Sequence, residues 1–154
     1  MRNRFDRQLK TLNEKLTEMG MACEEVIALA ATAFTESDME MAARVQGEDD
    51  EIDRLERDIE SLCLKMLLQQ QPVARDLRQI SAALKMITDL ERIGDQASDI
   101  AEIILFLDGK SGIECSDIKD MATSVIKMVN SSIEAYVKRD LELAKKVQAA
   151  DDEV

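Results

Sequence analysis

The sequence predicts an all-α protein built from long amphipathic helices in elongated antiparallel bundles. Apolar residues make up 45% of the 154 residues, but aromatic residues make up only 3% and Trp is absent. Leu, Ala, Met, Glu and Lys dominate instead, and these residues favour helices over sheets. Apolar residues also recur in steps of three and four, which is the period of an amphipathic helix with one buried face.

This periodicity predicts three helices of similar length in the first two thirds of the chain. The first covers about residues 3–35, and the second covers about residues 38–69, with Asp38 as a capping residue. The only proline, Pro72, marks the turn to the third helix. The third helix ends at residues 108–112, where two glycines are expected to form a C-cap and a loop. Its expected buried stripe is Leu77, Ile80, Leu84, Ile87, Leu90, Ala97, Ile100, Ile104 and Leu107.

After this loop the helical pattern restarts, and part of it repeats the first half of the chain. A shift of 102 residues pairs residues 33–52 with residues 135–154, and nine of these twenty pairs are identical. Internal repeats of this kind indicate tandem structural units. We therefore expect a first three-helix unit at residues 1–108 and the start of a second at residues 109–154, truncated within its acidic motif.

Charge and the absence of histidine exclude several classes of function. The net charge of -12 repels nucleic-acid phosphates and anionic lipid surfaces, so direct nucleic-acid binding is disfavoured. No segment approaches the roughly 20 apolar residues of a membrane span, and the start of the chain has no signal-peptide pattern. A cytoplasmic protein without membrane insertion is therefore expected. Without histidine, the commonest general base and the usual nucleophilic triads are missing, so we expect no enzyme.

The three cysteines are odd in number, widely spaced and set among apolar neighbours. We interpret Cys23, Cys63 and Cys115 as small core-filling residues in a reducing compartment, and not as a redox site.

Two acidic segments carry the most informative chemistry. Asp49 with Asp53, and Glu91 with Asp95, are i,i+4 pairs, so each pair places two carboxylates on one helical face. The two segments are centred 21 residues before and 21 residues after Pro72. An antiparallel hairpin would bring the four carboxylates to one height across a groove. Such a set of oxygen ligands suits a hard cation, with Mg, Mn and ferric iron as candidates.

The alternative is a solvated acidic face, on which Arg54, Arg57 and Arg92 form salt bridges with neighbouring acids. The matched height of the two pairs favours the metal site. So does the repetition of the Asp-Asp-Glu triplet of residues 49–51 at residues 151–153.

Several of these segments together resemble the PhoU family. They are residues 5–9 with Met19-Gly20, the acidic segment 49–53, the Pro-x-x-Arg-Asp-Leu-Arg turn at 72–78, and residues 89–97, which contain Leu-Glu-Arg-Ile-Gly-Asp. The resemblance implies tandem three-helix bundles with multinuclear metal sites on Glu/Asp-x-x-x-Asp motifs, here Asp49/Asp53 and Glu91/Asp95. Asp99 departs from the Asn of many members, which could add a ligand or change the preferred ion.

The resemblance also implies a negative regulator of phosphate uptake and of the phosphate-starvation response. Such proteins act on a sensor histidine kinase and on the ATPase of the phosphate ABC transporter, commonly as homodimers. Our leading interpretation is a non-catalytic adaptor in which metal crosslinks the second and third helices. Two alternatives stay open: a protein that stores or buffers iron, and a structural bundle whose acids serve only solubility.

Overall fold

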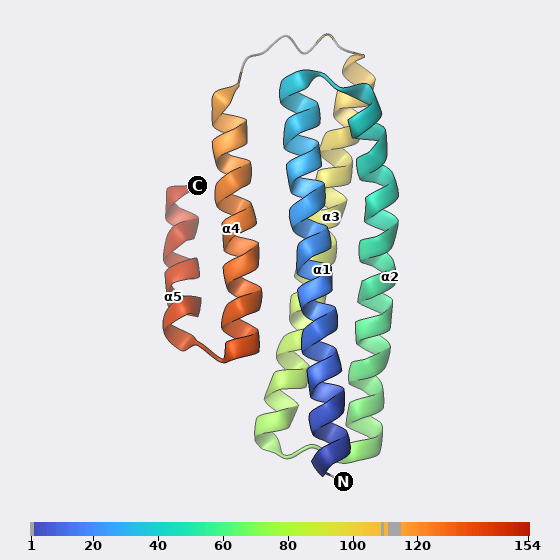
Figure 1. Ribbon diagram of the computed structural model, residues 1–154, viewed down its shortest axis with the longest axis vertical. Helices are drawn as coiled ribbons and strands as arrows, with labels where there is room; N and C mark the ends of the chain where they lie inside the picture. Colours follow the sequence, from blue (N-terminus) through green and yellow to red (C-terminus); the bar gives the residue numbers. More distant parts are fainter. Residues whose placement is uncertain (1, 109, 111–114) are drawn as a thin grey trace.

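The computed structural model describes residues 2–108, 110 and 115–154, and it confirms the all-α prediction. Five α-helices and one short 3₁₀ turn make up the secondary structure of these residues (Figure 1). None of the helices in this part of the chain is long and apolar enough to cross a membrane. The elements are α1 (Arg2–Glu36), α2 (Met39–Gln70), α3 (Ala74–Leu107), α4 (Ser116–Lys138), α5 (Leu141–Ala150) and the 3₁₀ turn Asp151–Glu153.

Local signals set the ends of α2 and α3 as predicted. The Asp38 carboxylate accepts a hydrogen bond from the Met41 amide at 3.0 Å, so Asp38 is the N-cap of α2. Gln71 ends α2 in the left-handed conformation, and Pro72 follows in the turn. At the C-terminal end of α3, Asp108 is the C-cap and also has the left-handed backbone conformation. The glycines expected in the loop after it lie outside the described residues.

The first three helices form an antiparallel bundle whose core runs along its full length (Figure 1). The start of α1 lies beside the α2–α3 turn, where the Arg4 guanidinium donates a hydrogen bond to the Gln69 side-chain oxygen at 3.0 Å. Large apolar side chains from all three helices are removed from solvent, and each contributes roughly 1.5–3 kcal/mol to the free energy of unfolding. They include Leu12, Leu16, Met19, Val26, Ile52, Leu55, Ile59, Met66, Ile80 and Ile104.

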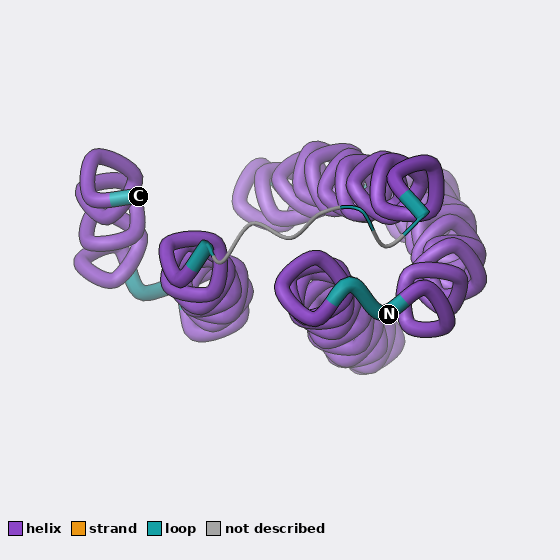
Figure 2. Tube along the Cα trace, turned by 90° about the horizontal axis from the view of Figure 1, so that it is seen from above, coloured by secondary structure: helices purple, strands orange, loops and turns teal. Residues whose placement is uncertain are grey.

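The fourth helix packs along α1 on the outside of this bundle, and α5 packs on α4 (Figure 2). Gly20 permits the close approach of α1 and α4, since a Cβ at this position would lie 2.9 Å from Ile133 Cγ1. The Tyr136 hydroxyl also anchors α4 by donating to the Gln79 carbonyl of α3 at 2.9 Å. The division into units at residues 108 and 109 stays a prediction.

The buried stripe of α3 differs from the prediction, most strongly at Leu77 and Ile100. These two residues are 48% and 46% exposed, whereas Ala83, Gly94 and Ala101, which were not expected in the stripe, are buried. At 100° per residue, Leu77 and Ile100 lie at opposite edges of the face that meets α1 and α2. The prediction was wrong there because an apolar pattern does not separate the edge of a buried face from its middle. Small residues take the middle, where the helices approach most closely.

Candidate metal centre

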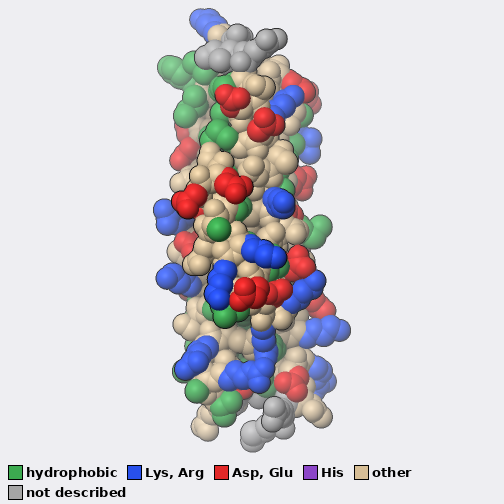
Figure 3. Space-filling model, turned by 90° about the vertical axis from the view of Figure 1, so that its left-hand side faces the viewer, with side chains coloured by type: hydrophobic (Ala, Val, Ile, Leu, Met, Phe, Trp, Pro, Cys, Tyr) green, Lys and Arg blue, Asp and Glu red, His purple; other side chains and the backbone are tan. Residues whose placement is uncertain are grey.

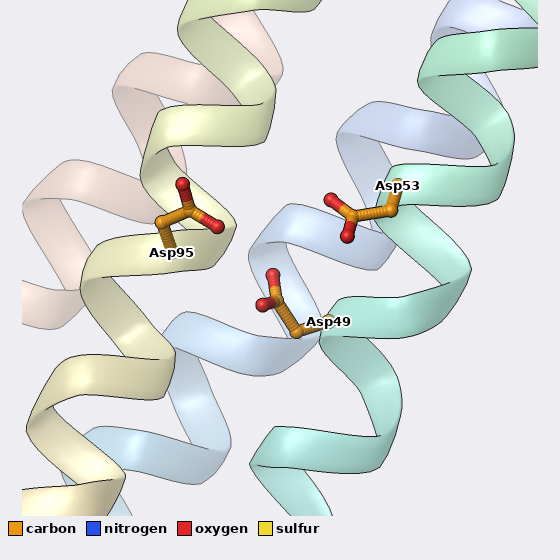
Figure 4. Close-up of side chains that lie close together, drawn as sticks. All are labelled: Asp49, Asp53 and Asp95. Carbon is orange, nitrogen blue, oxygen red and sulfur yellow. The ribbon is translucent and has the colours of Figure 1, made fainter.

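The four predicted ligands meet between α2 and α3, in two groups that share Asp53. Oxygen atoms of Asp49, Asp53 and Asp95 lie within 4.8 Å of one another. Figure 4 shows Asp49 and Asp53 extending from α2 toward Asp95 on α3. The second group joins Asp53 to Glu56 and Glu91 with the same spacing. The hairpin therefore brings the acids of α2 and α3 to the same height, as expected from their equal distances in sequence from Pro72.

Glu56 is the member of this cluster that was not predicted from the sequence. It lies three residues after Asp53 and seven after Asp49, so it extends the same face of α2 by one turn. The signal was present in this spacing, but Glu56 has no i,i+4 acidic partner within the 49–53 segment. Its proximity to Glu91 depends on how α2 and α3 pack.

Gly94 lets the Asp49 carboxylate lie directly against the backbone of α3. A Cβ on Gly94 would lie 2.7 Å from Asp49 Oδ1 and 3.0 Å from Ile52 Cδ1, and both distances are too short. A glycine inside a helix costs roughly 0.5–1 kcal/mol relative to alanine. In return, the Gly-Asp step of α3 provides both the space for Asp49 and the carboxylate of Asp95.

The crowding of these acids raises the pKa of several of them. Burial, followed by the charges of Asp53 and Asp95, raises the pKa of Asp49 to about 6. A hydrogen bond that protonated Glu91 donates to Asp95, followed by burial, raises the pKa of Glu91 to about 7. The pKa of Glu56 is also raised, first by burial and then by the charge of Asp53. Without a cation, the cluster therefore retains protons that isolated carboxyl groups would release at neutral pH.

Two oxygen atoms in the cluster are buried without a hydrogen-bond partner among the described residues. They are Asp49 Oδ1 and Asp53 Oδ1, which belong to neighbouring turns of α2. A buried acceptor without a partner costs about 1–3 kcal/mol. A hard cation prefers carboxylate oxygens and would satisfy both atoms while cancelling the repulsion among the acids.

Two of the three arginines invoked for a solvated acidic face, Arg54 and Arg92, form salt bridges with neighbouring acids, but these acids lie outside the cluster. Arg54 donates to Glu51 at 2.9 Å and to Asp58 at 3.0 Å, and Arg92 lies 3.8 Å from Asp89. Across the described part of the chain, no Lys or Arg forms an ion pair with any of the five clustered acids. The salt bridges of this face therefore leave the clustered acids without an ion-pair partner, although the charge of Arg57 acts to lower the pKa of Glu56.

Three other acidic positions lie outside both groups. Asp99 is exposed and affects the cluster as a nearby negative charge, which contributes to the raised pKa of Asp49. Asp151 and Asp152, in the repeated triplet, are exposed in the 3₁₀ turn and join no ligand group formed by described residues.

The thiol of Cys23 lies beneath the cluster but does not belong to it. Its sulfur donates to the Leu90 carbonyl at 3.3 Å, and the side chain is fully buried. Burial, together with the charge of Asp49, raises the pKa of Cys23 to about 12. Cys63 is buried as well, whereas Cys115 is partly exposed. The expected core role is confirmed for Cys23 and Cys63.

The family model described as the PhoU domain matches residues 16–104 and 118–154. The chain belongs to the PhoU family. Among its PhoU relatives is the phosphate-specific transport system accessory protein PhoU homolog of Clostridium acetobutylicum. That protein is 38% identical over 152 residues, which cover 97% of this chain and 69% of the relative. The homolog of Aquifex aeolicus is also 38% identical, over 96% of this chain and 67% of the relative.

The fold agrees with a solved member of the PhoU family. The crystal structure of PhoU from Pseudomonas aeruginosa superposes with a TM-score of 0.88 at 32% sequence identity. The match covers 97% of this chain and 72% of that chain. The helical arrangement described above is therefore that of a PhoU protein.

Proposed function

We propose that this chain is a cytoplasmic, non-catalytic negative regulator of phosphate uptake and of the phosphate-starvation response. The observation that carries this proposal is the similarity, over nearly the whole chain, to accessory proteins of the phosphate-specific transport system. The partners are the ATPase of the phosphate ABC transporter and a sensor histidine kinase, and the acting form is a homodimer.

In this proposal the carboxylate cluster holds a metal ion that stabilises the α2–α3 hairpin. Asp49, Asp53 and Asp95 supply one set of oxygen ligands, and Glu56 and Glu91 supply another through the shared Asp53. The ion is a hard cation, with Mg, Mn or iron as candidates. The support is the pair of unpartnered buried oxygens and the absence of a compensating ion pair in the described part of the cluster. Neutralising these charges would fix the spacing of α2 and α3, and with it the surface offered to partners.

The regulatory role is tested by alkaline phosphatase activity in phosphate-rich medium, measured with and without the gene in the source organism. Loss of a negative regulator should leave the activity high, and complementation should lower it again. Unchanged activity after deletion would contradict the phosphate role and would favour a metal-handling function.

The metal site is tested separately, with Asp53→Asn compared with Asp50→Asn. Asp53 belongs to both ligand groups, while Asp50 is an exposed acid three residues away that belongs to neither. Titration of the purified protein with Mn²⁺ should show a loss of affinity on the order of tenfold or more for Asp53→Asn. Asp50→Asn should bind as the wild type does. Equal binding by the two variants would remove Asp53 as a ligand.

Storage or buffering of iron is the second candidate function, favoured by the two adjacent ligand groups that share Asp53. The two functions differ in stoichiometry. A regulatory site holds a few tightly bound ions, whereas a store holds many exchangeable ions whose number follows the iron supply. Metal analysis of protein purified from iron-rich and iron-poor cells separates them.

A further inference from the structure

One end of the three-helix bundle is basic, although the chain as a whole has a net charge of -12. The start of α1 and the α2–α3 turn lie together at this end (Figure 1). This basic end is formed by residues 3–11, 60–70 and 72–82. Together these segments carry six basic residues and three acidic ones. The basic residues are Arg4, Arg7, Lys10, Lys65, Arg75 and Arg78, and the acidic ones are Asp6, Glu60 and Asp76.

The arginines of the Pro-x-x-Arg-Asp-Leu-Arg turn are not neutralised locally. Arg75 and Arg78 are exposed, and within the described residues no hydrogen bond or ion pair engages either guanidinium. They line an open groove of about 660 Å³ whose other charged residues are Arg139, Lys145 and one acid, Asp140, of the α4–α5 region. Figure 3 shows this side of the molecule, where Lys and Arg side chains predominate in the lower part.

Apolar side chains project from the same end. Leu68 is 84% exposed at the end of α2, and Val73 is 67% exposed just before α3. Exposed apolar residues among cations are typical of surfaces that rest in the headgroup region of a membrane.

The acidic cluster does not cancel this local positive charge. Asp49 lies about 20 residues before the α2–α3 turn, which corresponds to roughly 30 Å along the helix. The Debye length at physiological ionic strength is about 8 Å, so charges that far from the tip are screened. A surface touching the tip therefore experiences the local excess of cations and not the net charge of the chain.

We propose that this basic end, centred on Arg75 and Arg78, docks on the surface of an anionic lipid bilayer. The cations of this end are spread over three helices around two projecting apolar side chains. A fluid anionic surface accommodates this arrangement without a complementary pocket, whereas an acidic protein partner would need one to hold Leu68 and Val73. The contact is peripheral and involves no membrane span. It departs from the expectation, drawn from net charge alone, that anionic lipid surfaces repel the chain.

The test is co-sedimentation of the purified chain with vesicles of phosphatidylcholine, with and without phosphatidylglycerol. The variant Arg75→Glu/Arg78→Glu is compared with Arg44→Glu/Lys119→Glu. The control makes the same change in net charge at exposed residues near the opposite end of the molecule. Circular dichroism confirms that both variants remain helical.

Wild-type protein should bind the phosphatidylglycerol vesicles, should not bind phosphatidylcholine alone, and should be released by added salt. Because each Lys or Arg at an anionic surface contributes a severalfold gain in partitioning, the double variant should bind roughly 30-fold more weakly or worse. The control should bind as the wild type does. Failure of the wild type to bind anionic vesicles would overturn the proposal in favour of an acidic protein partner. Equal losses of binding in both variants would also overturn it, because net charge and not the basic end would then determine the binding. Metal content and phosphate regulation do not enter this measurement, so its outcome is independent of the function proposed above.

Discussion

Gly94→Ala is the substitution that most directly tests how α2 and α3 build the carboxylate cluster. The new methyl group would lie 2.7 Å from Asp49 Oδ1 and 3.0 Å from Ile52 Cδ1. Both atoms are the ends of side chains, so rotation of Asp49 and Ile52 can relieve the contact. Rotation of Asp49 carries its carboxylate away from Asp95. We therefore expect metal affinity to fall more than stability does.

The stability effect can be separated from helix propensity with Gly47→Ala as a control. Gly47 lies inside α2 as Gly94 lies inside α3, but a Cβ at Gly47 would have no neighbour within 4 Å. Alanine at this open site should stabilise the protein by about 0.4–1 kcal/mol. Alanine at position 94 should bring the same gain in helix stability. The methyl group would also overpack the contact with Asp49 and Ile52, which should cost about 1–3 kcal/mol. The free energy of unfolding of Gly94→Ala should therefore lie about 1–3 kcal/mol below that of Gly47→Ala.

Urea unfolding of the metal-free proteins measures this difference, and Mn²⁺ titration of the same samples measures the loss of binding. Asp49→Ala should remove most of the penalty of Gly94→Ala, because it deletes the oxygen that the methyl group meets. If Gly94→Ala is as stable as Gly47→Ala and binds metal as tightly as the wild type, the close approach of Asp49 to α3 is wrong. If stability falls while Mn²⁺ binding is unchanged, Gly94 serves packing alone.

Two further predictions concern titration and thiol reactivity. The folded chain keeps protons on Asp49 and Glu91, whose pKa values are about 6 and about 7, after the unfolded chain has released them near pH 4. The metal-free protein should therefore lose stability as the pH rises from about 4 to about 7 and then level off. Urea midpoints across this range should fall for the wild type and change less for Asp49→Asn/Glu91→Gln; a midpoint that rises equally in both would contradict the shared protons. Ellman's reagent should modify Cys115 rapidly in the native protein, because this thiol is partly exposed. Cys23 and Cys63 should react slowly, because burial raises the pKa of Cys23 to about 12 and that of Cys63 to about 11. Rapid reaction of a second thiol would show that the core opens more readily than its packing indicates.

The periodic pattern of the sequence predicted the helices and their order, since capping and turn chemistry act over a few residues. Asp38 caps α2 through its own side chain, and Pro72 follows the left-handed Gln71 that ends it. The error lay in the detail of the buried face, where Leu77 and Ile100 were expected inside and lie at the edges. Helical spacing gives the direction of a side chain, but the position of the neighbouring helix decides whether it is covered.

The candidate site was predictable in part for the same reason. Asp49, Asp53, Glu91 and Asp95 could be selected because spacing within a helix and distance from the turn together fix their height. Glu56 could not be selected in this way, because its contact with Glu91 depends on the packing of the two helices.

The sequence by itself determined the helical class, the turn at Pro72, the internal repeat and the pairing of acids across the hairpin, because all of these follow from short-range periodicity and chain length. Only the tertiary structure decided where the charges lie relative to one another. It places the acids of α2 and α3 within ligand distance, with the space left by Gly94. It also gathers Arg75 and Arg78 with the start of α1 into a basic end that a net charge of -12 conceals. Electrostatic interactions in water are screened over about 8 Å, so local arrangement, and not total charge, determines what a surface binds.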